Sequence, residues 1–179
     1  MTTYHHGDLP TALLRAAGNS LEKDGIGGIS LREAARRAGV SHNAPYRHFP
    51  DREALLAALA VEGFAELGER LHGKPGRELG PVYVRFALEQ PQRFRLMFGG
   101  VLPLANYPKL RAAAGAAHEA LVDAFRDLPR PELAAAAAWS LVHGLSHLLL
   151  DGHFATQDPE TFVGEVLGAV RLAAAQRAA

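Results

Sequence analysis

The stretch from residue 30 to residue 49, SLREAARRAGVSHNAPYRHF, constrains the fold of this chain more than any other segment. Its first apolar residues recur at helical spacing, which predicts a short helix with a narrow face of small side chains. Gly39 can end this helix, because glycine adopts the left-handed backbone of a helix C-terminus at little cost. Ser41 follows, and its side-chain oxygen can cap a second helix. Two short helices joined by a glycine turn predict a helix-turn-helix.

The second helix of this motif, expected from His42 to His48, has side chains suited to DNA. Its first turn is the part of a recognition helix that meets base edges, and Asn43 in that turn can pair with adenine. Hydrogen-bond donors that can reach phosphate occur on both helices of the motif, at Arg32, Arg36, Arg37, Tyr46, Arg47 and His48. The alternative is a packed helical pair with a solvated basic face. Exposure of His42, Asn43, Tyr46 and Arg47 together would separate the two interpretations.

The charge of the chain supports DNA binding only locally. There are 19 Lys and Arg residues and 19 Asp and Glu residues, so the formal net charge is zero, whereas many DNA-binding domains are strongly basic. Residues 31–52 nevertheless hold five arginines against Glu33 and Asp51. This modest excess predicts weak, salt-dependent binding to non-specific DNA and a need for dimerisation.

The first third of the chain resembles the DNA-binding domain of TetR-type transcriptional regulators. The resemblance is carried by the G-V-S turn, the Tyr-x-His-Phe end of the recognition helix and the Phe-Pro-Asp-Arg-Glu-x-Leu-Leu start of the next helix. It implies a DNA-binding domain over residues 1–54 and a helical ligand-sensing and dimerisation domain over residues 55–179. It also implies a homodimer that binds double-stranded DNA at a palindromic operator, usually represses, and is released by a small molecule.

The same resemblance assigns roles to individual residues. Contacts with phosphate are expected from Ser30, Arg32 and Arg52, and base reading from His42 and Asn43. Anchoring of the recognition helix is expected from Ser41, Tyr46 and His48, while Arg47 is a candidate for phosphate from its side chain alone. Two positions depart from the family pattern. Pro45 replaces the aliphatic residue more usual before the tyrosine, and Arg52 stands where lysine is common. Pro45 leaves the tilt of the recognition helix open.

Helix start and stop signals predict an all-α chain of about nine helices. Hydrophobic residues make up 48% of the chain, which supports a substantial core, and the absence of cysteine removes disulfides and cysteine–zinc sites. No run of about 18 uninterrupted apolar residues occurs, and the N-terminus lacks the apolar run of a signal peptide. These features predict a soluble cytoplasmic protein that has no membrane partner.

Two apolar stripes near the C-terminus predict the dimer interface. The first lies on a helix expected from residue 132 to residue 151, and the second on the final helix, from about residue 159 to residue 176. Two such helices from each subunit can form a four-helix interface. The alternative is packing within one subunit. The residues of the stripes are Ala134, Ala137, Leu141, Leu145 and Leu148, and then Val166, Val170 and Ala173.

A second cluster, Trp139-Ser140-Leu141-Val142-His143-Gly144, resembles the C-terminal domain named after its Trp-His-Gly signature in one TetR branch. The opening Tyr-His-His-Gly-Asp-Leu of the chain is also typical of that branch. An aromatic-lined ligand pocket is expected here, with His143 as its polar group. The alternative is a core tryptophan beside a hydrogen-bonded histidine. The expected pocket residues are Phe86, Phe94, Met97, Phe98, Trp139 and His143.

Metal and enzyme chemistry have weaker support. His143 and His147 lie one helical turn apart and could share zinc with His118 or His153, but histidine pairs at this spacing are common, so we predict no metal and no cofactor. The chain has no phosphate-binding glycine loop and no nucleophile elbow. We therefore predict a regulator that is not an enzyme. The competing class is a helical small-molecule-binding protein without DNA-binding activity.

Overall fold

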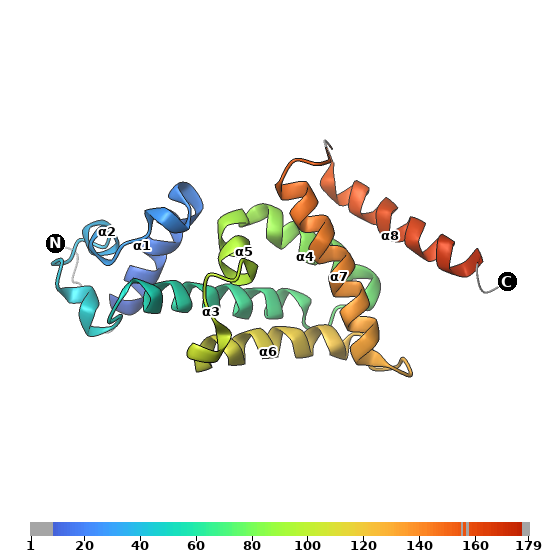
Figure 1. Ribbon diagram of the computed structural model, residues 1–179, viewed down its shortest axis with the longest axis horizontal. Helices are drawn as coiled ribbons and strands as arrows, with labels where there is room; N and C mark the ends of the chain where they lie inside the picture. Colours follow the sequence, from blue (N-terminus) through green and yellow to red (C-terminus); the bar gives the residue numbers. More distant parts are fainter. Residues whose placement is uncertain (1–8, 155, 157, 177–179) are drawn as a thin grey trace. The chain divides into compact units, whose positions relative to one another are not determined.

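The computed structural model describes residues 9–176 apart from 155 and 157, and for residues 171–176 it describes the backbone alone. Within these residues the chain forms eight α-helices and three short 3-10 helices, with no strand (Figure 1). The predicted all-α class is confirmed. The α-helices are α1 (Leu9–Asp24), α2 (Leu31–Arg37), α3 (Arg52–Leu71), α4 (Gly76–Glu89), α5 (Pro91–Phe98), α6 (Pro108–Asp123), α7 (Pro131–Leu150) and α8 (Pro159–Gln176), and the 3-10 helices are η1 (Ile26–Gly28), η2 (Ala44–Arg47) and η3 (Leu104–Asn106).

The chain divides into two compact units. The N-terminal unit comprises the residues up to 65 together with residues 90–114, and the C-terminal unit comprises residues 66–89 and 115–179. The helices α3 and α6 run through both units. The domain boundary expected between residues 54 and 55 lies in the first turn of α3, whereas the two units divide after residue 65 of the same helix. The units are therefore joined by a continuous helix and not by a linker.

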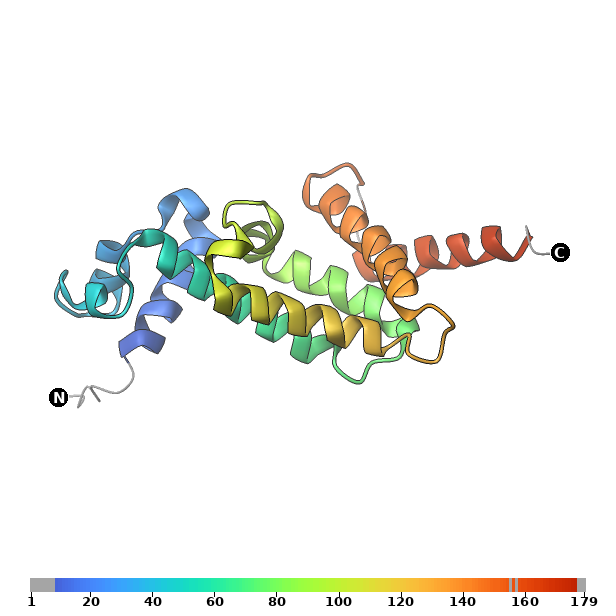
Figure 2. The same ribbon diagram turned by 60° about the horizontal axis from the view of Figure 1, so that its bottom comes forward.

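The core of the N-terminal unit forms where α1 and α2 pack together beside the first turns of α3 (Figures 1 and 2). Leu13, Leu21, Leu55 and Leu59 are fully buried there. They recur at helical spacing along α1 and α3, so each helix buries one apolar face. This core holds the helix-turn-helix in place within the N-terminal unit.

A carboxylate from α1 caps α5 within the same unit. Glu22 accepts hydrogen bonds from the backbone N–H groups of Gln92, over 3.2 Å, and Arg93, over 2.9 Å. The first N–H groups of a helix have no partner inside the helix, and a negative charge there also meets the positive end of the helix dipole. Glu22 therefore joins α1 to α5.

In the C-terminal unit α4 packs against both α7 and α8. Gly80 allows this approach, because a Cβ atom at its position would lie 2.5 Å from Cδ1 of Leu167 and 3.3 Å from Cγ1 of Val142. Helix α7 is long and apolar enough to cross a membrane by length and composition alone. In this fold it packs on α4 and carries the buried residues Ala135, Val142, Leu145 and Ser146.

Candidate nucleic-acid interface

The first helix of the motif and its turn are as the sequence predicts. Ser30 accepts a hydrogen bond from the backbone N–H of Glu33 over 3.1 Å, which caps α2. Gly39 has φ of 70°, and the next N–H, from Val40, donates to the carbonyl of Ala35 over 3.0 Å. The left-handed glycine and this bond end α2 and turn the chain toward the second element.

The second element differs from the prediction. Instead of an α-helix from residue 42 to residue 48, the structure has turn residues followed by the 3-10 helix η2, Ala44–Arg47. Pro45 explains the difference, because it has no N–H to donate back to Ser41 in an α-helical turn. The N–H of Ala44 donates to the Ser41 carbonyl instead, over 3.0 Å, and no side chain caps η2. The cap expected from the Ser41 side chain is therefore absent from this described segment.

The four side chains that distinguish a DNA reader from a structural helix are all exposed. His42, Asn43 and Arg47 are exposed, and Tyr46 is 48% exposed. Pro45 and Phe49 are buried and hold the segment against the core. The segment is therefore held to the core on one side and exposes polar side chains on the other. This arrangement fits the recognition of a ligand as large as DNA.

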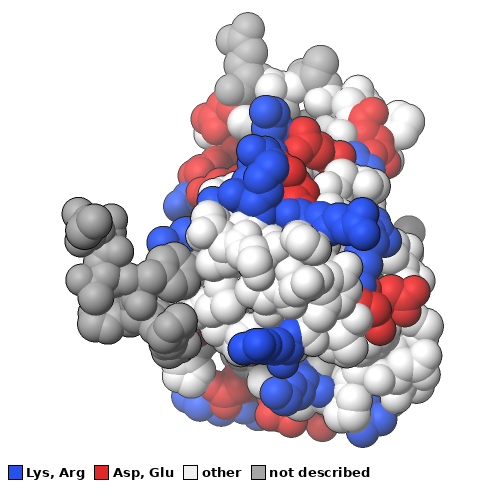
Figure 3. Space-filling model, turned by 90° about the vertical axis from the view of Figure 1, so that its left-hand side faces the viewer, with Lys and Arg blue, Asp and Glu red and all other residues white. Residues whose placement is uncertain are grey.

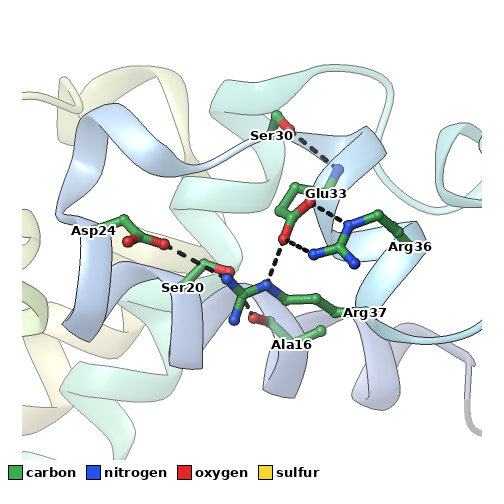
Figure 4. Close-up of polar contacts among 7 residues, drawn as sticks. All are labelled: Ala16, Ser20, Asp24, Ser30, Glu33, Arg36 and Arg37. Atoms are coloured by element: carbon green, nitrogen blue, oxygen red, sulfur yellow. Dashed lines mark hydrogen bonds and ion pairs between the residues drawn. The ribbon is translucent and has the colours of Figure 1, made fainter.

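Two arginines of α2 are already engaged by one carboxylate (Figure 4). Glu33 accepts from Arg36 at 2.8 and 2.6 Å and from Arg37 at 2.6 Å. These bonds, led by those from Arg36, lower the pKa of Glu33 to about 2. Arg37 also lies 3.6 Å from Asp24. The positive charge that the sequence assigns to α2 is thus partly neutralised, a pairing that the i, i+3 and i, i+4 spacing could have revealed.

Arg52 makes a structural contact that the sequence did not reveal. Its Nε donates to the carbonyl oxygen of Ile29 over 2.9 Å, and its Nη2 donates to the carbonyl oxygen of Ile26. Arg52 thereby fastens the start of α3 to the segment before α2. A guanidinium has five N–H groups, so these two bonds leave donors for a phosphate.

Four of the predicted contact residues meet at one surface hollow. Ser30, Arg32, Tyr46 and Arg52 line it. Ser41, His42, Asn43, Arg47 and His48 are exposed nearby in the chain but do not line the hollow. Figure 3 shows this side of the molecule, with Lys and Arg side chains in separate groups and uncharged surface between them. The carboxylate of Asp51 also lines the hollow, so the two arginines and the hydroxyl donors there fit contacts to individual phosphates rather than a continuous basic groove.

The C-terminal unit contains an apolar cavity of about 380 Å³. It is lined mainly by α4, α7 and α8, and its aromatic walls are Tyr83, Phe125 and Trp139. Trp139 Nε1 donates to Tyr83 Oη over 3.0 Å, and that hydroxyl lies 2.9 Å from His143 Nδ1. Burial lowers the pKa of His143, with a smaller contribution from His147, and so favours the neutral ring.

The other expected pocket residues lie elsewhere. Phe94 and Phe98 form an aromatic cluster with Phe64 in the N-terminal unit, and Met97 is buried in the same unit. Phe86 is fully buried beneath the guanidinium of Arg70, 5.4 Å from its ring centre. Of the six, only Trp139 lines the cavity, with His143 behind it. Tyr83, which links the two, was missed because a lone tyrosine on a helix gives no signal in the sequence.

Family comparisons match most of the chain. Residues 77–170 match the family described as "Tetracyclin repressor-like, C-terminal domain", and residues 13–59 match "Bacterial regulatory proteins, tetR family". The chain belongs to the TetR family. The narrower resemblance to the branch with the Trp-His-Gly signature stays a prediction, and its Tyr-His-His-Gly-Asp-Leu opening lies, except for Leu9, outside the described residues.

Curated relatives of this TetR-family chain match it over part of its length. The class A tetracycline repressor protein of transposon 1721, from Escherichia coli, is 42% identical over 57 residues, which are 32% of this chain and 26% of that protein. An HTH-type transcriptional regulator of Mycobacterium tuberculosis (strain ATCC 25618 / H37Rv) is 29% identical over 114 residues, which are 58% of this chain and 48% of that protein. The chain thus spans between about a quarter and a half of these relatives.

Solved structures extend the likeness to the whole fold. A protein of unknown function from Rhodococcus sp. RHA1 has a TM-score of 0.80 at 34% identity, covering 93% of this chain and 95% of that one. A structure of the multidrug binding protein EbrR complexed with imidazole has a TM-score of 0.60 at 23% identity, covering 89% and 93%. The second likeness shows the TetR fold alone.

Proposed function

We propose that this chain is a ligand-responsive, DNA-binding transcriptional regulator, a repressor that a small molecule releases from a palindromic operator. The observation that carries the proposal is the exposure of His42, Asn43, Tyr46 and Arg47 on a helix-turn-helix whose inner side is buried. His42 and Asn43 read bases, while Ser30, Arg32, Tyr46 and Arg52 contact phosphate around their shared hollow. Ser41, Arg47 and His48 contribute further donors.

The proposed dimer forms through α7 and α8. Helix α7 is apolar, yet only 22% of its most apolar 18-residue stretch is buried. Its exposed side carries no charge between Leu133 and Leu148. The residues on that side are Leu133, Ala136, Ala137, Ser140, Gly144 and Leu148. A second copy of the chain fits this side best, because a palindromic operator needs two recognition elements about 34 Å apart.

The stripe expected from the sequence needs adjustment. Leu145 is buried within the subunit and Leu141 is only partly exposed and lines the cavity, so neither fits a contact with a partner copy. Ala137 and Leu148 are exposed and do not line the cavity, and Val170 lines the cavity but is still 48% exposed. The side chain of Ala173 lies outside the described residues. The proposed interface therefore uses a face of α7 rotated from the one that periodicity indicated.

In the proposed mechanism a ligand in the cavity changes the packing of α4 against α7 and α8. This change alters the separation of the two recognition elements in the dimer, so that they no longer match successive major grooves. The strength of the response depends on how much better the ligand binds one arrangement than the other. A regulator of this kind acts in the cytoplasm and needs no cofactor.

Selection from a randomised DNA pool tests the function directly. The purified chain is mixed with the pool at moderate salt, and the retained DNA is sequenced. We expect an enriched palindrome with half-sites about one helical turn apart. Absence of enrichment, at every salt concentration at which the protein stays folded, would instead favour the competing helical small-molecule-binding protein.

A further inference from the structure

The cavity in the C-terminal unit exists because small side chains face it from α7 and α8. Gly164 and Gly168 lie one turn apart on α8 and Ala138 lies on α7, and all three line the cavity. A Cβ atom at either glycine would meet no heavy atom within 4 Å. The volume of about 380 Å³ is near the lower end of the range of small-molecule sites, about 300–1,000 Å³. The size fits a compact molecule.

The polar groups of the aromatic wall are bonded to one another. Indole nitrogen can only donate, so Tyr83 Oη accepts from Trp139 Nε1. The single proton of that hydroxyl is then available for the bond to His143 Nδ1. When His143 accepts this proton at Nδ1, its ring is neutral and carries its own proton on Nε2, the charge state that the lowered pKa of His143 favours. The wall therefore holds a hydrogen-bonded series whose members satisfy each other without a ligand.

No carboxylate is among the described residues that line the cavity, so a cation there would have only the faces of the aromatic rings as partners. Arg77 is the one charged residue among these lining residues. The Arg77 side chain is 71% exposed and lies 3.5 Å from Glu78, so its guanidinium stays hydrated. A cation buried in the cavity would lose its hydration without gaining a counter-ion. An anion buried there would gain at most the hydrated guanidinium of Arg77 as its counter-ion.

We propose that the cavity binds small, uncharged aromatic molecules and discriminates against their charged analogues, cations most strongly. The rings of Tyr83, Phe125 and Trp139 favour an aromatic ligand, because aromatic pairs gain more than their buried area alone provides. The inference rests on the proposed function only in taking this cavity as the sensor site. It names the chemistry of the effector, which the fold alone leaves open.

Tryptophan fluorescence can test this selectivity, because Trp139 is the single tryptophan of the chain and lines the cavity. Three nitroaromatic quenchers of matched shape are titrated into the full chain at pH 7.5. They are 4-nitrobenzyl alcohol, 4-nitrobenzoate and 4-nitrobenzylammonium. We expect the alcohol to bind at least about tenfold more tightly than either ion, with the ammonium weakest. Equal or tighter binding of an ion, or no quenching by the alcohol up to its solubility, overturns the proposal.

A pair of glycine variants locates the binding. Gly168→Leu adds a side chain at a residue that lines the cavity, whereas Gly115→Leu adds the same side chain on α6 at a residue that does not line it, and a Cβ atom at either position meets no heavy atom within 4 Å. We expect Gly168→Leu to weaken alcohol binding at least about tenfold and Gly115→Leu to leave it unchanged. Equal binding by folded Gly168→Leu, checked by its melting curve, overturns the assignment to this cavity. No DNA is present, so failure here leaves the operator selection unaffected, and failure of that selection leaves this result standing.

Discussion

Arg52 Nε donates to the carbonyl oxygen of Ile29 over 2.9 Å, so the first residue of α3 holds the segment that leads into α2. Arg52→Ala removes this bond and the one to Ile26. We expect it to lower the free energy of unfolding by about 1–2 kcal/mol, measured by urea unfolding followed by circular dichroism. Arg52→Lys should not restore stability, because an ammonium lacks the planar fork that reaches both carbonyls.

Arg32→Ala provides the control for Arg52. Arg32 is exposed and lines the same hollow as Arg52. Its removal should change the free energy of unfolding by less than about 0.5 kcal/mol while reducing the salt dependence of DNA binding by about one phosphate contact. If the free energy of unfolding were the same for Arg32→Ala and Arg52→Ala, the structural role assigned to Arg52 would be excluded.

Glu33 limits the positive charge of the motif, because it holds Arg36 and Arg37 at 2.6 Å. Its pKa of about 2 keeps it ionised at any pH at which DNA binding is measured. Glu33→Gln should raise affinity for random-sequence duplex and steepen its salt dependence by about one or two phosphate contacts. Fluorescence anisotropy at several salt concentrations measures both. Glu69→Gln, the same charge change at an exposed position of α3, should have a smaller effect, and equal effects would indicate net charge alone.

Base reading and phosphate contact separate at Asn43 and Tyr46, both exposed. Asn43→Ala should relax base preference at one position of each half-site, at a cost of about 1–3 kcal/mol for the preferred base. Tyr46→Phe removes one hydroxyl donor at the hollow and should weaken binding to all sequences alike. Affinity for a panel of single-base operator variants measures the two patterns. If both variants bound the panel as the unmodified protein does, η2 would not be the recognition element.

Much of the fold was predictable because helix signals are local. Gly39, with φ of 70°, follows α2 at the position that the sequence indicated, whereas the cap from Ser30 is seen only in the structure. The α-helical second element was wrong because Pro45 removes one N–H, and a seven-residue segment with few bonds cannot compensate for that loss. The residues at which helices begin and end can thus be predicted from sequence. The choice between α and 3-10 geometry in so short a segment cannot.

The candidate sites were predictable only where partners are close in sequence. The engagement of Arg36 and Arg37 by Glu33 follows from helical spacing. The bonds from Arg52 to Ile29 and from Trp139 to Tyr83 join residues 23 and 56 positions apart. The spacing of apolar residues along one helix does not tell which other helix it packs against. For this reason the sequence predicted Phe94 and Phe98 in the ligand pocket, although they pack in the N-terminal unit.

Tyr83 and His143 predict a pH dependence of stability. Burial lowers the pKa of His143 in the folded chain, so the unfolded chain binds its proton more readily. The stabilising effect is therefore complete above the ordinary histidine pKa of about 6.5 and is lost as the pH falls below it. The urea concentration at the unfolding midpoint should fall as the pH is lowered from 8 to 5. In His143→Gln this fall should be smaller. A decline of the same size in His143→Gln would exclude His143 as its source.

Leu148 and Leu104 offer a matched test of the dimer, since their exposed fractions are 41% and 43%. Leu148 lies on the uncharged side of α7, whereas Leu104 lies in η3 of the N-terminal unit. Leu148→Glu puts a charge into the apolar interface proposed on α7, so sedimentation velocity should show a monomer. Operator affinity should then fall by about 100-fold or more, because the second half-site no longer binds as part of the same molecule. Leu104→Glu should remain dimeric and bind normally. A dimeric Leu148→Glu would move the interface away from this face of α7.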